Sequence, residues 1–258
     1  MQKFVLRSKN FFTNNSLSEF CCSYFATMKY RHLFFDLDHT LWDFEANARL
    51  TLEELYTELS LEKKGVYDFD LFHKNYLAHN EILWERYRNG HIKQDELRMK
   101  RMRLALLDFK IADDSLAQEM NVRFLDLLPT RTMLFPHTME IMNYLTDKNY
   151  ELHLITNGFE VTQHSKLKHS GLDKFFKEVI TSEGSNSLKP NKDIFDFAFE
   201  KTGARPEESI MLGDNIDVDI IGAFNAGIDQ VFVNHNNIPI NIKPTFSVTT
   251  LKELEDIF

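Results

Sequence analysis

The chain has 258 residues, a length typical of one large domain or two modest ones. Its 43% hydrophobic and 27% charged residues are ordinary for a globular protein, and its net charge of -9 disfavours a nucleic acid polymer as partner. No apolar run is long enough to cross a bilayer, so we expect no membrane partner. The adjacent Cys21 and Cys22 cannot form a disulfide framework, which favours a reducing, cytoplasmic location.

Residues 1–27 differ in character from the rest of the chain. They carry Lys3, Arg7 and Lys9 but a single acid, Glu19, and they lack the uninterrupted apolar stretch of a secretory signal. A transit-like peptide is the weaker alternative. Because a strand pattern begins directly after Met28, we interpret residues 1–27 as an N-terminal extension that is disordered or non-functional.

A short apolar run over residues 31–36 predicts a buried parallel strand that ends at Asp36. The chain then changes to apolar residues at helical spacing among many charges. This pattern predicts helices over residues 45–59, 70–87, 94–107 and 113–127, with a break at Asn89-Gly90. We therefore expect a small all-helical insert over residues 44–130.

Helices and strands alternate after Pro136. The predicted helices cover residues 138–148, 160–169 and 193–201 and a segment that ends at Ala226; the predicted strands cover 150–156, 178–181, 209–213 and 230–233. Such alternation indicates a parallel sheet with helices on both faces. The expected fold is α/β: a Rossmann-like core over residues 28–43 and 131–258, interrupted by the helical insert.

Polar side chains collect where these strands end, which is the ligand-binding edge of an open parallel sheet. They are Asp36, Asp38, Thr156, Asn157, Asp214 and Asp219, with Lys189 in a nearby loop. A carboxylate nucleophile divides phosphate ester hydrolysis into two steps through an aspartyl-phosphate. The carboxylate and the phosphate repel each other, so a cation must sit between them, and Mg²⁺ with its oxygen ligands suits that task.

Each group has a role in that chemistry. Asp36 and Asp214 can ligate Mg²⁺ by their side chains. Asp38 can protonate the leaving alkoxide and then activate water. Thr156 and Lys189 can bind the phosphoryl oxygens as negative charge moves onto them.

These residues resemble, in chain order, the four motifs of the haloacid dehalogenase superfamily, over residues 29–258. The motifs are Asp36-Leu37-Asp38-His39-Thr40, Thr156, Lys189 and the segment 213–219. The resemblance implies that Asp36 is the nucleophile, Asp38 the acid/base, and Thr156 and Lys189 the phosphate ligands. It also implies Mg²⁺ bound by Asp36, Asp214 and the backbone carbonyl of Asp38, and a cap formed by the helical insert.

Three further residues need a separate interpretation. We expect Asp219 to support the metal site from behind rather than to ligate directly. Asn157 either orients Asp36 or holds the turn, and we count it with the phosphate-binding residues. His39 occupies a variable loop position and is expected to face solvent.

A narrower resemblance concerns the substrate. Segments 156–160, 163–167, 170–172 and 225–227, with Lys189-Pro190, are similar to nucleotidases that dephosphorylate pyrimidine nucleoside monophosphates. The implied function is a Mg²⁺-dependent phosphomonoester hydrolase, a 5′-nucleotidase on a small substrate whose base stacks on a cap aromatic such as Trp84 or Tyr87. Sialic-acid-phosphate phosphatases share much of the pattern, so a sugar-phosphate phosphatase is the alternative.

Two other classes are less consistent with the sequence. A dehalogenase needs neither Asp38 nor Mg²⁺, and a non-catalytic binding protein would tolerate loss of Asp36, Asp38, Lys189 or Asp214, all of which are present. The sequence leaves the oligomeric state open.

Overall fold

The protein is described here by a computed structural model, which covers residues 29–258; our interpretation of residues 1–27 therefore lies outside it. A six-stranded parallel sheet forms the centre, in the order β3-β2-β1-β4-β5-β6. The strands are β1 (His32–Phe35), β2 (Glu151–Thr156), β3 (Glu178–Thr181), β4 (Ser209–Gly213), β5 (Asp229–Val233) and β6 (Phe246–Val248). This sheet, with a helical segment inserted after β1, confirms the expected fold class.

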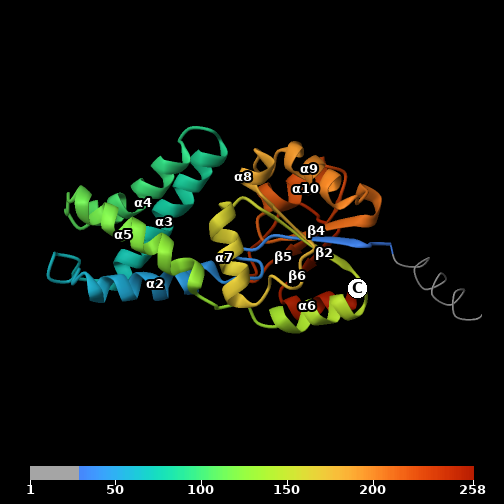
Figure 1. Ribbon diagram of the computed structural model, residues 1–258, viewed down its shortest axis with the longest axis horizontal. Coiled ribbons are helices and arrows are strands. Elements are labelled where there is room, and N and C mark those ends of the chain that lie inside the picture. Colours follow the sequence, from blue (N-terminus) through green and yellow to red (C-terminus); the bar gives the residue numbers. More distant parts are fainter. Residues whose placement is uncertain (1–28) are drawn as a thin grey trace, which may run out of the picture.

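Helices cover both faces of the sheet (Figure 1). Helix α6 (Thr138–Asp147) and the short helix η4 (Leu251–Asp256) lie on one face, and α9 (Lys192–Thr202) and α10 (Ile221–Asn225) lie on the other. Successive side chains of a strand point to opposite faces, so Leu33 and Phe35 pack into the core beneath α6 while Phe34 packs into the core beneath α9. Both faces of β1 are thus buried, as the apolar run predicted.

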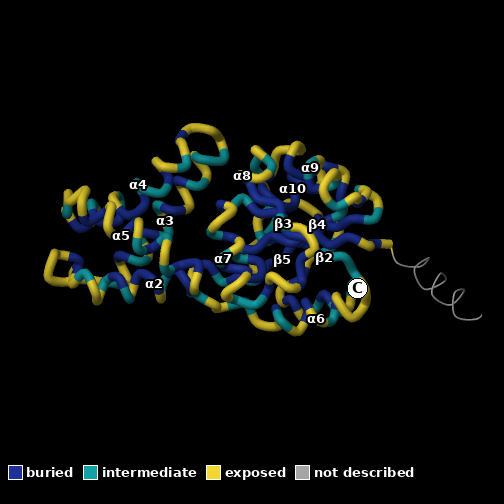
Figure 2. Tube along the Cα trace, viewed as in Figure 1, coloured by how far each residue is buried: buried dark blue, intermediate teal, exposed yellow. Residues whose placement is uncertain are grey.

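The inserted segment forms a separate helical lobe beside the sheet (Figure 1), and we call it the cap. It consists of α2 (Phe44–Glu58), α3 (Phe69–Arg88), α4 (Gln94–Leu107), α5 (Asp114–Leu127) and the 3₁₀ turn η1 (Leu128–Thr130). Asp43, Asp68 and Asp113 each accept a hydrogen bond from a backbone N–H in the first turn of α2, α3 and α5. Figure 2 shows that each helix buries one side and exposes the other.

Several details differ from the sequence-based prediction. The segment after β4 is a π-helical turn η3 (Ile216–Ile220) that leads into the short α10, rather than one continuous helix. Strand β6, helix η4 and the short helices α8 (Ser182–Ser185) and η2 (Pro206–Glu208) were not predicted. These elements are only three to six residues long, too short for hydrophobic periodicity to reveal. Among the described helices, none is both long and apolar enough to cross a membrane.

Candidate active site

The strand order reverses direction at β1, so the topological switch point lies between β1 and β4. Asp36 follows β1 and Asp214 follows β4, which places the two carboxylates on either side of this point. The Asp36 backbone N–H donates to the Leu212 carbonyl at 2.9 Å, which holds Asp36 against β4. A cavity of about 540 Å³ lies here between the sheet and the cap, and both acids line it.

Lys189 is the central cation of the site. Its Nζ lies 2.6 Å from Asp36 Oδ1, 2.6 Å from the Ile155 carbonyl oxygen and 2.8 Å from Asp219 Oδ1, and the side chain is 1% exposed. Asn157 fixes the Lys189 loop, because Lys189 N donates to Asn157 Oδ1 at 2.7 Å and Asn157 Nδ2 donates to the Lys189 carbonyl at 2.9 Å. The turn after β2 therefore positions an ammonium group that lies far from it in sequence.

Asp36, Asp214 and Asp219 form an acidic cluster whose carboxylate oxygens lie within 4.8 Å of one another. Burial raises the pKa of Asp36 to about 8; Lys189 opposes this shift, whereas Asp219 and Asp214 add to it. Desolvation also raises the pKa of Asp214 to about 7, with the charge of Asp219 as the next cause. Three like charges so close together destabilise their ionised forms unless a cation joins them.

The π-helical turn explains how Asp219 reaches this cluster. Its Oδ2 accepts a hydrogen bond from the Asn215 N–H at 3.0 Å, which turns the side chain back toward the end of β4. Gly213 leaves the necessary space, because a Cβ there would lie 2.3 Å from Asp219 Oδ2. Asp214 Oδ1 in turn accepts a hydrogen bond from the Thr40 hydroxyl at 3.0 Å.

The donor set of this cluster fits Mg²⁺. Carboxylate oxygens are the ligands that Mg²⁺ prefers, and a dication would offset both the burial and the mutual repulsion that raise the pKa values of Asp36 and Asp214. The carboxylate of Asp38 is not part of the cluster.

Asp38 instead points to helix α7 (Glu160–Ser170). Lys166 Nζ donates to Asp38 Oδ1 at 2.6 Å, and Gln163 Nε2 donates to Asp38 Oδ2 at 3.0 Å and to Thr156 Oγ1 at 2.7 Å. Lys166 is buried and lies 4.4 Å from the centre of the Trp42 ring. The sequence indicated no role for Gln163 or Lys166, although their spacing of three places them on one face of the helix that follows Thr156.

The cap contributes a second set of side chains to the cavity, among them Asn80, Trp84, Arg88 and Arg101. Burial lowers the pKa of Arg88, while Glu85 and then Asp219 act against that shift. One face of Trp84 stacks on Phe159 from the core, with ring centres 5.4 Å apart. Of the two aromatic residues expected near the substrate, Trp84 lines the cavity, whereas Tyr87 packs edge-on against Phe159 and is not among the lining residues.

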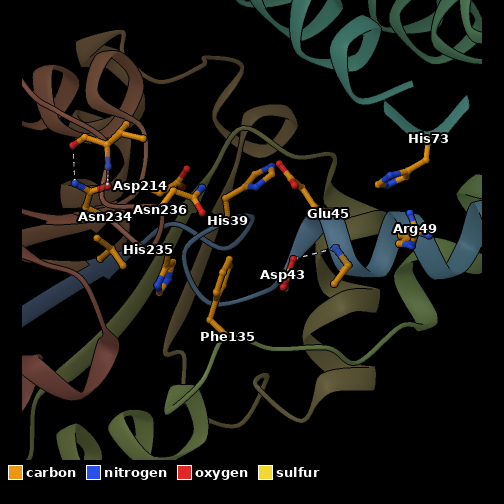
Figure 3. Close-up of a pocket in the computed structure, with 13 residues that line it drawn as sticks. His39, Asp43, Glu45, Arg49, His73, Phe135, Asp214, Asn234, His235 and Asn236 are labelled. Atoms are coloured by element: carbon orange, nitrogen blue, oxygen red, sulfur yellow. Dashed lines mark hydrogen bonds between the residues drawn. The ribbon is translucent and has the colours of Figure 1, made fainter. Parts of the chain in front are cut away.

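A second cavity of about 420 Å³ lies between α2 and the loop after β5 (Figure 3). His39, Glu45 and Asp214 line both cavities. His39, which we expected to face solvent, is half-buried and tilts against the Phe44 ring. His235 and Phe135 also line the second cavity, and their rings stack with centres 3.9 Å apart. The His235 Nε2 lies 3.0 Å from the carbonyl oxygen of Thr40, which braces the loop that carries Asp38.

The fold and the site define an α/β protein with an inserted helical cap and an acidic cluster at the switch point of the sheet. The model of the haloacid dehalogenase-like hydrolases matches residues 30–227, and the chain belongs to this family.

Individual relatives share most of their length with this chain. It is 32% identical to the pyrimidine 5′-nucleotidase YjjG of Escherichia coli (strain K12), over 89% of this chain and 98% of that protein. It is 31% identical to a glyceraldehyde 3-phosphate phosphatase of Methanothermobacter thermautotrophicus, over 78% and 84%. A solved structure of the HAD-hydrolase YfnB of Bacillus subtilis, bound to magnesium, superposes with a TM-score of 0.79 at 28% identity, over 89% and 98% of the two chains. The resemblance to pyrimidine 5′-nucleotidases inferred from the motifs is thus confirmed.

Proposed function

We propose that this hydrolase is a phosphomonoesterase that acts through a phosphorylated Asp36. The observation that carries the proposal is the meeting of a nucleophile, a phosphate-binding cation and an acidic metal site in one cavity. Asp36, Lys189 and Asp214 all line that cavity, and Lys189 touches Asp36 directly.

The chemistry follows in two balanced steps. Asp36 attacks phosphorus, the bond from phosphorus to the ester oxygen breaks, and Asp38 gives its proton to the leaving alkoxide. Asp38, now a carboxylate, takes a proton from water as that water attacks the aspartyl-phosphate. Phosphate leaves and Asp36 is restored. Lys166 and Gln163 hold Asp38 in place for both transfers.

Three residues bind or frame the phosphoryl group in this proposal. Lys189 and Thr156 stabilise the charge that builds on its oxygens. Asn157 is occupied by two hydrogen bonds to the Lys189 backbone, so we assign it the task of holding the Lys189 loop.

Mg²⁺ would be held by Asp36, Asp214 and the carbonyl of Asp38. When bound, it supplies the positive charge that lets a carboxylate and a phosphate approach each other. Asp219 supports this site from behind, because it contacts Lys189 at 2.8 Å and is anchored by the Asn215 N–H.

For the substrate we propose a pyrimidine nucleoside 5′-monophosphate such as UMP, dUMP or dTMP. The motifs shared with pyrimidine nucleotidases and the similarity to YjjG support this choice. The cavity of about 540 Å³ beneath the cap has room for a mononucleotide, and we expect it not to accept a polynucleotide or a phosphoprotein. A cytoplasmic location remains our prediction from Cys21 and Cys22, which lie outside the described residues.

A sugar-phosphate phosphatase is the second candidate, which the similarity to a glyceraldehyde 3-phosphate phosphatase supports. Comparison of kcat/KM for dUMP, dAMP and several sugar phosphates, with and without Mg²⁺, tests both. If kcat/KM for a sugar phosphate exceeds that for dUMP by about tenfold, the transition-state preference is about 1.4 kcal/mol. The nucleotidase proposal is then wrong while the phosphatase proposal stands.

A further inference from the structure

A polar pair lies on the cap wall of the cavity. Asn80 from α3 and Arg101 from α4 both line the cavity, and they are 7% and 4% exposed. Arg101 Nη1 donates to Asn80 Oδ1 at 3.5 Å. The cap residues that line the same cavity include Leu77, Leu125 and Leu128. The pair is thus a polar patch on a partly apolar wall.

The environment of Arg101 is poor for a buried cation. Within the described chain no carboxylate lies within ion-pair distance of it, and its Nε and Nη2 have no hydrogen-bond partner. Its guanidinium instead lies 5.0 Å from the centre of the Phe124 ring and near the Tyr76 hydroxyl, whose pKa burial raises and the Arg101 charge lowers. Unpaired buried polar groups destabilise a fold. Stability of the cap alone would favour an apolar side chain at this position, so Arg101 calls for another explanation.

The contact with Arg101 determines what Asn80 offers to the cavity. An amide has one acceptor oxygen and one donor nitrogen, and Arg101, a donor only, fixes the oxygen on its own side. The Asn80 nitrogen is then left as the free group, since no hydrogen bond from the described residues engages it. The Asn80 amide nitrogen therefore presents a hydrogen-bond donor, which suits an acceptor oxygen on a ligand.

We propose that Asn80 and Arg101 form a subsite for the leaving group, in which Asn80 donates a hydrogen bond to a carbonyl oxygen of a pyrimidine base. Arg101 is a positioning residue that fixes the Asn80 amide and adds positive charge behind it. The inference rests on the proposed function and deepens it, because it names the group that would distinguish a uracil or thymine nucleotide from an adenine nucleotide. Uracil and thymine carry carbonyl oxygens, whereas adenine has none. A site built to bond a polar group discriminates strongly against an analogue that lacks it.

Asn80→Asp gives the sharpest test. It keeps the size of the side chain and offers Arg101 a carboxylate partner, so folding is retained, but it replaces the free donor by an acceptor. We expect kcat/KM for dUMP, divided by kcat/KM for dAMP, to fall about tenfold, mainly through a higher KM for dUMP. Inhibition by the product deoxyuridine should weaken in parallel. Arg101→Met should change the same ratio in the same direction, by releasing the Asn80 amide.

A matched pair of variants separates binding from cap stability. Asn80→Leu should lower the ratio as Asn80→Asp does. Asn121→Leu removes a similarly buried Asn from α5 that does not line the cavity, and it should leave the ratio unchanged. If both Asn80 variants keep the wild-type ratio, the subsite is refuted although the nucleotidase proposal stands. If the wild type itself prefers dAMP or a sugar phosphate to dUMP, the proposal of a pyrimidine nucleotidase fails instead.

Discussion

The Lys189 ammonium lies 2.6 Å from the Asp36 carboxylate, with 1% and 12% of the two side chains exposed. Burial alone would lower the pKa of Lys189, but Asp219 and Asp36 together raise it, so the ammonium stays charged. One cation thereby orients the proposed nucleophile, Asp36. The contact makes Asp36 the first residue to test.

Asp36→Asn should abolish turnover while the fold is kept. The amide fills the same space and can still accept a hydrogen bond from Lys189, but it cannot attack phosphorus. We expect kcat for p-nitrophenyl phosphate to fall on the order of 10³-fold or more, measured beside thermal melting. The exposed Asp173→Asn is the control and should keep wild-type kcat. Near-normal turnover by Asp36→Asn would exclude the proposed mechanism.

Asp38→Asn should slow phosphoryl transfer from an alkyl ester more than from p-nitrophenyl phosphate. Alkoxides need a proton as they leave, whereas p-nitrophenolate is stable without one. Single-turnover measurements of the first step with dUMP and p-nitrophenyl phosphate show the difference. Equal losses for both esters would contradict the acid role of Asp38.

Lys166→Met provides a companion test of Asp38 positioning. Lys166 is 2.6 Å from Asp38 and touches the proposed reaction only through it. Loss of Lys166 leaves Gln163 as the partner of Asp38 on α7. We therefore expect Lys166→Met to lose less rate than Asp38→Asn does, and to slow the p-nitrophenyl ester less than the alkyl ester, as Asp38→Asn does. A loss shared equally by the two esters would indicate a merely structural role.

The sequence predicted the strand ends well because parallel strands bring their carboxyl ends to one edge. That rule alone brought Asp36, Thr156 and Asp214 together before any coordinates. It did not show how Asp219 contacts the cluster, because that contact depends on a π-helical turn, a backbone irregularity without a sequence pattern of its own. The rule about strand ends also says nothing of Lys166, which lies within a helix and resembles an ordinary surface lysine in the sequence, although it contacts Asp38.

The sequence predicted the helices of the cap but not which of their side chains line the cavity. Hydrophobic periodicity gave α3 and α4, yet it could not show that Asn80 and Arg101 meet and line the cavity, because this depends on how two helices pack. Trp84 and Tyr87 show the same limit. Both were candidates for stacking on a substrate base, whereas the structure places Trp84 at the cavity and Tyr87 beside it.

Mg²⁺ should bind more tightly as the pH rises from 6 to 8. In the metal-free protein the pKa of Asp36 is raised to about 8 and that of Asp214 to about 7, so protons compete with the cation below these values. The increase in melting temperature caused by Mg²⁺ measures this binding. Asp214→Asn should lose most of the increase, while the exposed Asp217→Asn should keep it. A Mg²⁺ response that weakens with rising pH would contradict the assignment.

The final prediction concerns His153, which is buried on β2 and stacks on Phe34 with its Nε2 3.2 Å from His32 Nδ1. Burial, reinforced by the charge of His32, lowers its pKa to about 4 from 6.5. Between these values the unfolded chain binds more protons, so stability is complete above pH 6.5 and is lost as the pH falls toward 4, on the order of 3 kcal/mol. His153→Gln should reduce the fall in urea midpoint between pH 7 and pH 5, and the exposed His164→Gln should not. An unchanged fall in His153→Gln would show that other groups cause the acid sensitivity.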